Sequence, residues 1–127
     1  MRIEVTRLVK QAERDLENAR KNIGIEAYEV AAFLAEQAVE KYLKACWMVM
    51  KKETPPHTHS LTELGDALGV PASLRKHLVN LTADYTTSRY PDAANGIPYE
   101  IYDRETAENK VAAGEAVIAW LRTRMNA

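Results

Sequence analysis

The sequence predicts an all-α protein: an up-and-down bundle of four main helices plus one short helix, in a single domain over residues 1–127. Apolar residues recur at spacings of three and four along almost the whole chain, which places them on one face of each helix. No segment alternates apolar and polar residues for long enough to indicate a strand. The connecting segments are short, so successive helices are expected to be antiparallel.

The first half of the chain predicts two long helices. The first has a stripe at helical spacing, made of Val5, Leu8, Ala12, Leu16, Ala19 and Ile23. Gly24 is expected to end it in a left-handed conformation, because a glycine has no Cβ to clash there. The second helix is expected from about Glu26 to about Lys51, before the Pro55–Pro56 pair. Its stripe consists of Ala32, Glu36, Val39, Leu43, Cys46 and Met50, and so includes one carboxylate.

The third and fourth helices are predicted by caps and breakers. In a capping box, the Ser60 hydroxyl accepts a hydrogen bond from a backbone amide while Glu63 reaches back to the Ser60 amide. This short helix is expected to end at Gly69. Pro71 opens the next helix, where its missing N–H costs nothing. That helix is expected to end near Arg89, because the following residue precedes a proline and therefore disfavours helical geometry.

A connector separates this helix from the last one. It reads YTTSRYPDAANGIPYE, and its aromatic and polar groups are compatible with either a ligand surface or a well-made turn. Asp103 is the predicted N-cap of the last helix. The buried face of that helix is expected to consist of Ala107, Val111, Gly114, Ile118, Leu121 and Met125.

Composition and charge narrow the function classes. The chain has 17 Lys and Arg against 18 Asp and Glu, a formal charge of -1, so any anion site must be local. Charged residues interrupt both the N-terminal segment and the longest apolar run, so neither a signal peptide nor a membrane span is expected. Cys46 is the single cysteine, which excludes an internal disulfide, and a buried position is expected for it. A cytoplasmic location is the default.

Three segments together resemble the HEPN family (higher eukaryotes and prokaryotes nucleotide-binding). They are EVAAFLAEQAVEKYLKA, HTHSLTEL and SRYPD, followed by the final amphipathic helix. The resemblance covers nearly the whole chain and implies a bundle of four or five helices that forms a homodimer and binds nucleotides or RNA. It also implies a minimal nucleotidyltransferase partner, because many HEPN genes lie beside such a gene, and some of these pairs act as toxin and antitoxin.

The signature of the HEPN RNases is absent. Several family members are metal-independent RNases with an Arg followed by a His after about four to six residues. Here Arg75 lies only two positions before His77, and no His follows Arg89. The sequence instead resembles the subgroup with an Arg-Tyr-Pro-Asp connector. No catalytic residue is predicted, although an RNA-cleaving toxin with a diverged active site stays open.

The predicted nucleotide-binding site lies in a cleft between the second helix and the connector. Its six residues are Lys41, Lys44, His59, Arg89, Tyr90 and Asp92. In this hypothesis Arg89 and the two lysines bind phosphate, Tyr90 stacks on a base, and Asp92 orients Arg89. His59 precedes a helix start, where backbone amides favour anions.

Structural roles remain open for each of these residues. Arg89 can complement the helix dipole with Asp92 as its partner, and the lysines can form a solvated face. His59 can anchor a loop. His57 and His59 lack an evident third ligand, so no metal and no cofactor are expected. A third reading makes the protein a non-catalytic structural partner, with the connector as its interface.

Overall fold

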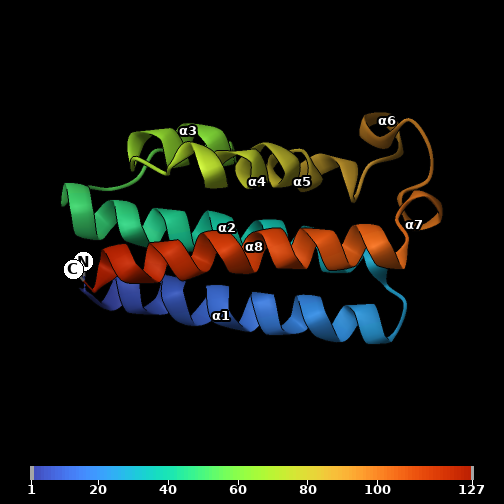
Figure 1. Cartoon of the computed structure of the whole chain (residues 1–127), viewed down its shortest axis with the longest axis horizontal. Coiled ribbons are helices and arrows are strands. Elements are labelled where there is room, and N and C mark those ends of the chain that lie inside the picture. The colour runs from blue at the N-terminus through green and yellow to red at the C-terminus, as the bar shows by residue number, and fades with distance from the viewer. Residues whose placement is uncertain (1, 127) are drawn as a thin grey trace.

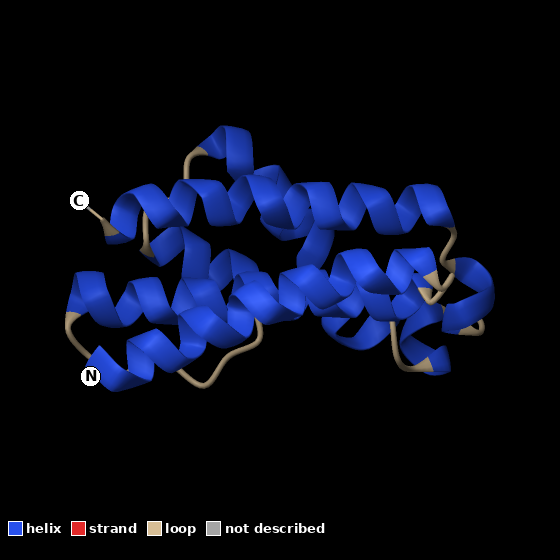
Figure 2. Ribbon diagram, turned by 90° about the horizontal axis from the view of Figure 1, so that it is seen from below, coloured by secondary structure: helices blue, strands red, loops and turns tan. Residues whose placement is uncertain are grey.

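The computed structural model describes residues 2–126, which form helices joined by short loops and, within that range, no strand (Figure 1, Figure 2). The helices are α1 (Arg2–Gly24), α2 (Tyr28–Lys51), α3 (Leu61–Ala67), α4 (Ala72–Thr82), α5 (Asp84–Thr87), α6 (Pro91–Ala94), α7 (Pro98–Ile101) and α8 (Arg104–Met125). The predicted all-α class is confirmed. Among the described helices, none is both long and apolar enough to cross a membrane.

The long helices run up and down the bundle. Helices α1 and α2 are antiparallel, α4 returns along the bundle after the short α3, and α8 runs back towards the starting end (Figure 1). The start of α1 and the end of α8 therefore lie at one end of the molecule, and α6 and α7 lie at the other (Figure 1). The predicted topology is confirmed, with α5, α6 and α7 as additional single-turn helices.

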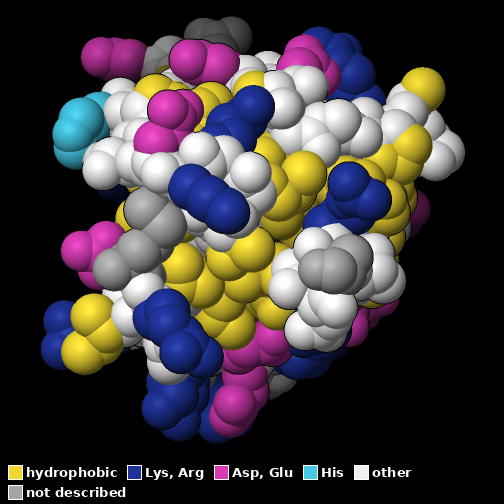
Figure 3. Space-filling view, turned by 90° about the vertical axis from the view of Figure 1, so that its left-hand side faces the viewer, with side chains coloured by type: hydrophobic (Ala, Val, Ile, Leu, Met, Phe, Trp, Pro, Cys, Tyr) yellow, Lys and Arg dark blue, Asp and Glu magenta, His cyan; other side chains and the backbone are white. Residues whose placement is uncertain are grey.

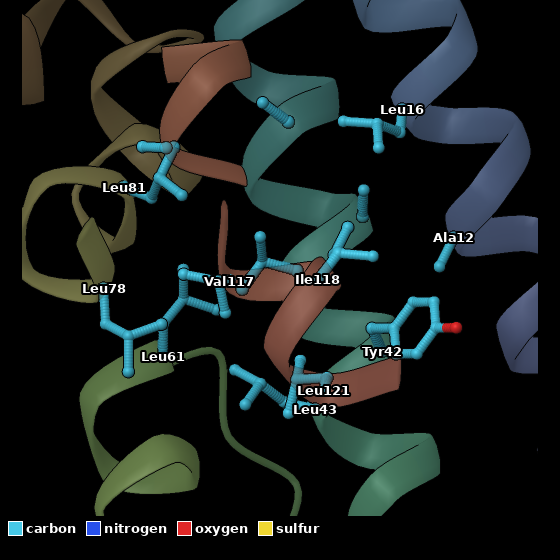
Figure 4. Packing of buried hydrophobic residues seen from close by; sticks show 14 of the residues in the cluster. Ala12, Leu16, Tyr42, Leu43, Leu61, Leu78, Leu81, Val117, Ile118 and Leu121 are labelled. Carbon is cyan, nitrogen blue, oxygen red and sulfur yellow. The ribbon is translucent and has the colours of Figure 1, made fainter. Parts of the chain in front are cut away.

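Helix α2 is the central element, because it contacts α1, α8, α3 and α5. The core combines large aliphatic side chains from all the long helices and α3 (Figure 4). The labelled members are Ala12, Leu16, Tyr42, Leu43, Leu61, Leu78, Leu81, Val117, Ile118 and Leu121. Full burial of one leucine contributes roughly 1.5–3 kcal/mol. Cys46 is also fully buried, as predicted.

One glycine is required where α3 meets α4. A Cβ added to Gly65 would collide with the side chain of Leu78. The absence of a side chain at Gly65 lets α3 pack closely on α4 next to the core.

The turn between α1 and α2 corrects one prediction. The left-handed residue is Glu26, with φ 64°, and not Gly24. The amide of Glu26 donates to the Ile23 carbonyl at 3.0 Å, and that of Ala27 donates to the Asn22 carbonyl at 2.8 Å. This pair of bonds is a Schellman motif, which places the left-handed residue two positions after Gly24. Helix α2 consequently begins at Tyr28 rather than near Glu26.

The predicted fourth helix is also interrupted. The sequence pattern predicts a helix that reaches Arg89 without a break, yet α4 ends at Thr82 and α5 begins at Asp84. Side chains on both sides of the interruption bond to other elements. The Thr82 hydroxyl accepts from the Leu61 amide at 3.0 Å, and the Asp84 carboxylate is buried against Tyr102 and Lys110.

The two predicted N-caps are present, one of them in altered form. Asp103 accepts from the Thr106 amide at 2.8 Å, as predicted. The Ser60 hydroxyl accepts from the Glu63 amide at 3.2 Å, but Glu63 does not reach the Ser60 amide directly. Instead, Thr58 Oγ1 lies between them: it donates to Glu63 at 2.9 Å and accepts from the Ser60 amide at 3.1 Å.

Candidate functional site

The candidate site lies where one face of α2 meets α5 and the loop before α3. Along α2, Phe33, Glu36, Gln37, Glu40 and Lys44 follow one another at helical spacing. Tyr85 and Arg89, from α5 and its C-terminal end, contact this face together with His59. We call the group of Phe33, His59, Tyr85, Arg89 and Tyr90 the Arg89 cluster.

The two predicted lysines are each paired with a buried carboxylate. Lys41 Nζ lies 2.7 Å from Asp15 of α1 and 3.2 Å from the side-chain oxygen of Gln37. Lys44 Nζ lies 3.2 Å from Glu40, one turn earlier on α2. Both carboxylate side chains are only 8% exposed. A phosphate would therefore have to compete with these carboxylates, so the structure does not present either lysine as a free cation.

His59 is held between α2 and α5. Its Nδ1 lies 3.1 Å from Glu40, the carboxylate that also holds Lys44. Its ring stacks on Tyr85 with a centroid separation of 3.9 Å and an angle of 14° between the planes. The Tyr85 hydroxyl lies 3.0 Å from His59 Nε2. The imidazole is thus fixed by one acidic and one aromatic partner, although half of its side chain is exposed.

Arg89 is surrounded by aromatic rings instead of acids. Its guanidinium carbon lies 4.6 Å from the ring centroids of both Phe33 and Tyr85, and 5.0 Å from that of Tyr90. Its Nε donates to the Tyr85 carbonyl at 2.7 Å, which closes the end of α5. Among residues 2–126 it forms no ion pair, and this includes the expected one with Asp92. The rings, and not Asp92, orient this side chain.

Tyr90 and Asp92 lie on the exposed side of the site. The Tyr90 side chain is 53% exposed and precedes Pro91, the first residue of α6. Asp92 is exposed in the first turn of α6. Tyr90 is therefore accessible to a ligand beside the guanidinium, whereas Asp92 belongs to the start of a helix.

A buried carboxylate that sequence reasoning did not assign to the site lies on the same face of α2. Glu36 is fully buried. Its Oε1 accepts a hydrogen bond from the side-chain Nε2 of Gln37 at 2.8 Å, while its Oε2 has no partner among the described residues. Burial raises the pKa of Glu36 to about 8, and the negative charges of Glu40 and Asp84 add to this effect. The side chain is therefore mostly protonated at neutral pH. Its position on an otherwise apolar stripe was the sequence signal.

A second buried carboxylate joins α5 to α7 and α8. Asp84 accepts a hydrogen bond from the Tyr102 hydroxyl, and Lys110 Nζ lies 2.8 Å from its other oxygen. Burial and the neighbouring Asp84 raise the pKa of the Tyr102 phenol above its usual range. Lys110 also donates to the carbonyl and side chain of Asn80, both at 2.7 Å. The second Asp84 oxygen forms this ion pair but no regular hydrogen bond with a described residue. Because Asp84, Tyr102 and Lys110 each face another member of the network, we assign it a structural role.

The arrangement can bind an anion next to a flat group. Aromatic rings do not accept the hydrogen bonds of the two terminal guanidinium nitrogens, whereas Nε already donates to the Tyr85 carbonyl. Arg is suited to bidentate contacts with phosphate. The exposed Tyr90 ring beside it can stack on a base. No three His, Cys, Asp or Glu side chains gather in the described part of the chain in a way that could hold a metal ion.

A family model and solved structures were compared with this chain, and both kinds of comparison find the same family. The model of the HEPN domain matches residues 5–124. A crystal structure of TT1696 from Thermus thermophilus has a TM-score of 0.85 and 26% sequence identity, covering 94% of this chain and 97% of that one. The structure of ST0689, an archaeal HEPN homologue, has a TM-score of 0.82 and 34% identity, covering 95% and 97%. No curated protein matches the chain. From its sequence and its fold, the chain belongs to the HEPN domain family.

Proposed function

We propose that this HEPN domain binds a nucleotide or an RNA phosphate at the Arg89 cluster. In this proposal Arg89 binds the phosphate, and Tyr90 stacks on the base. The supporting observation is that the Arg89 guanidinium lies within 5.0 Å of three ring centroids and has no acidic partner among the described residues. An arginine held in place loses less conformational entropy when it binds a ligand than a freely rotating one does.

The other predicted site residues have unequal parts in this proposal. His59 shares the Tyr85 ring with Arg89, and its two ring nitrogens already contact Glu40 and the Tyr85 hydroxyl, so its part is to hold Tyr85 in place at the edge of the cluster. Lys44 reaches the same area only through Glu40, and Lys41 is directed to α1. Asp92 is kept as an exposed group at the rim and has no assigned contact.

A thermal-shift titration with ATP, GTP and a short oligoribonucleotide tests the proposal. A ligand that binds only the folded state raises Tm by mass action. We expect a shift with at least one of these ligands, and we expect Arg89→Ala to lose it. Arg7→Ala is the matched control, because it removes another exposed arginine without a described ion pair, from α1. No shift at millimolar ligand, or equal shifts for parent and Arg89→Ala, would refute the proposal.

The proposal includes assembly with other chains. As a HEPN domain, the protein is proposed to form a homodimer in the cytoplasm and to work with a minimal nucleotidyltransferase. Light scattering measures the first property, and co-expression with the protein encoded by the neighbouring gene, followed by co-purification, tests the second. Co-purification with no response to nucleotides would favour the alternative of a structural partner.

RNA cleavage is retained as a second candidate because of one juxtaposition. His59 and Arg89 both contact Tyr85, and Glu40 holds the His59 ring from the other side. A base next to a cation is the minimum that attack by a 2′-hydroxyl on its phosphate requires. His59 would take the role of base only by exchanging the Tyr85 hydroxyl at its Nε2 for the 2′-hydroxyl of the RNA. Incubation of labelled RNA with the protein, with and without a chelator, decides the question. Cleavage that survives chelation and disappears in His59→Ala would support the RNase, and intact RNA would exclude it.

A further inference from the structure

A hollow of about 370 Å³ lies at the end of the bundle opposite α6 and α7. Four apolar side chains line it: Val5 from α1, Met48 and Val49 from α2, and Met125 from α8, together with the polar Thr6. Figure 3 views this end of the molecule and shows apolar surface with Lys and Arg side chains around it. The volume is at the lower end of that of small-ligand pockets, which hold about 300–1,000 Å³.

The rim of the hollow is positively charged. Arg2 and Lys52 line it, and neither forms an ion pair with another described residue. Two more cations lie on nearby segments, Lys51 over the Trp47 ring at 5.1 Å and Arg124 over the Trp120 ring at 5.7 Å. The adjoining segments 2–6, 47–53 and 120–126 contain five basic residues, Arg2, Lys51, Lys52, Arg122 and Arg124, against Glu4 and Glu53. Arg122 is paired with Glu13 of α1, so the other four supply the positive charge at this end.

We propose that this hollow binds an acidic segment of a partner protein that inserts a leucine-like side chain. The charge of the rim is complementary to carboxylates, and the aliphatic walls are complementary to a branched or unbranched apolar side chain. Two of the four apolar residues that line the hollow are methionines, which adapt to side chains of different shapes. A concave surface accepts a protruding side chain.

Other occupants fit the same surface less well. Bases of single-stranded RNA need exposed aromatic faces, and the walls of the hollow contain none. A bilayer is bound by protruding apolar groups rather than by a hollow.

The hollow is separate from the Arg89 cluster. That cluster is built on α2, α5 and the loop before α3, and it shares no residue with the hollow. The two proposals can therefore fail independently.

The test uses the full chain and a defined probe, the peptide acetyl-DEELLEED-amide. Binding is followed through the methionine methyl signals in ¹H–¹³C spectra. We expect saturable shifts of the Met48 and Met125 methyls at peptide concentrations up to about 1 mM. A peptide with serines in place of both leucines, and one with lysines in place of the acids, should each bind at least about tenfold more weakly.

Two pairs of variants locate the binding. Arg2→Glu reverses a rim charge at the first residue of α1, where an acid also suits the helix dipole, so folding should be preserved. We expect binding about three- to tenfold weaker. Arg104→Glu makes the same change at the first residue of α8, at the far end of the bundle, and should bind as the parent does. Val49→Asp should abolish the shifts, whereas Val79→Asp on α4 should not.

Several outcomes would overturn the proposal. No methyl shift up to the highest concentration would do so, as would equal effects of the three peptides or of the two arginine variants. Shifts produced by an oligoribonucleotide or by anionic phosphatidylglycerol vesicles, and not by the acidic peptide, would assign the surface to those ligands. Shifts that change with protein concentration alone would assign it to a second copy of the chain.

Discussion

Three lysines and one arginine of this protein carry the same charge in opposite settings. Lys41, Lys44 and Lys110 each contact a carboxylate that is almost fully buried: Asp15, Glu40 and Asp84 respectively. Arg89 contacts three aromatic rings and, within the described chain, no carboxylate. A cation therefore marks an anion site only when no carboxylate of the fold has already neutralised it. The lysines should matter for stability and Arg89 for binding.

The largest expected effect comes from breaking a buried pair. Lys110→Met leaves Asp84 buried with only the Tyr102 hydroxyl as a partner, and should lower the free energy of unfolding by about 3–5 kcal/mol. Urea denaturation measures it. The double variant Lys110→Met, Asp84→Asn removes the uncompensated charge as well and should recover much of the loss. A single variant as stable as the parent would show that this pair is not structural.

Glu36, a buried carboxylate without a cationic partner among the described residues, should make the stability of the protein depend on pH. Its pKa is raised from an ordinary value of 4.5 to about 8 by burial, so the folded state holds a proton that the unfolded state releases. Stability should therefore be fully present below about pH 4.5 and fall as the pH rises towards 8. Glu36→Gln cannot ionise, so it should be more stable than the parent by a few kcal/mol at pH 8 and equally stable near pH 4.5. The same difference in unfolding free energy between Glu36→Gln and the parent at both pH values would contradict this.

A smaller effect is expected at the start of α3, which follows the segment that carries His59. Ser60→Ala removes the side-chain acceptor for the Glu63 amide and should cost about 1 kcal/mol. Thermal unfolding measures the loss. Ser73→Ala on the exposed side of α4, with no described side-chain bond, should change nothing. Equal losses at both positions would indicate that the cap contributes nothing specific.

The smallest effect on stability is expected for Arg89, which, unlike the three lysines, has no carboxylate partner in the described chain. Arg89→Ala loses the ring contacts of an exposed cation, so it should lower the free energy of unfolding by no more than about 1 kcal/mol. The same variant should lose ligand binding. Arg89→Lys keeps the charge but not the planar group, so it should restore ligand binding only in part. Ligand binding that is fully restored by lysine would show that the rings do not select arginine. A loss of several kcal/mol in Arg89→Ala would instead place Arg89 with the structural lysines.

Much of the fold follows from local signals. Stripes at helical spacing predict four long helices, and Asp103 and Ser60 predict two helix starts, because periodicity and capping depend on residues within a few positions. The break at Ala83 and the left-handed conformation of Glu26 do not follow from the apolar pattern. The hydrogen bonds that accompany each of them form only in the folded chain, and the spacing of apolar residues does not predict them. The single-turn helices α6 and α7, each opened by a proline, lie in the segment that the pattern predicts only as a connector.

The helical class, the order of the long helices and the burial of Cys46 can be predicted from the amino-acid sequence, because all of these follow from apolar periodicity and chain breakers. The pairing of charged side chains depends instead on how helices distant in the chain pack together. Lys41 and Asp15 are separated by 26 positions, as are Tyr85 and His59, and local spacing carries no information about such distant pairs. Burial then decides the consequence: it keeps a proton on Glu36, makes the lysine pairs structural, and leaves Arg89 as a cation that the described chain does not neutralise.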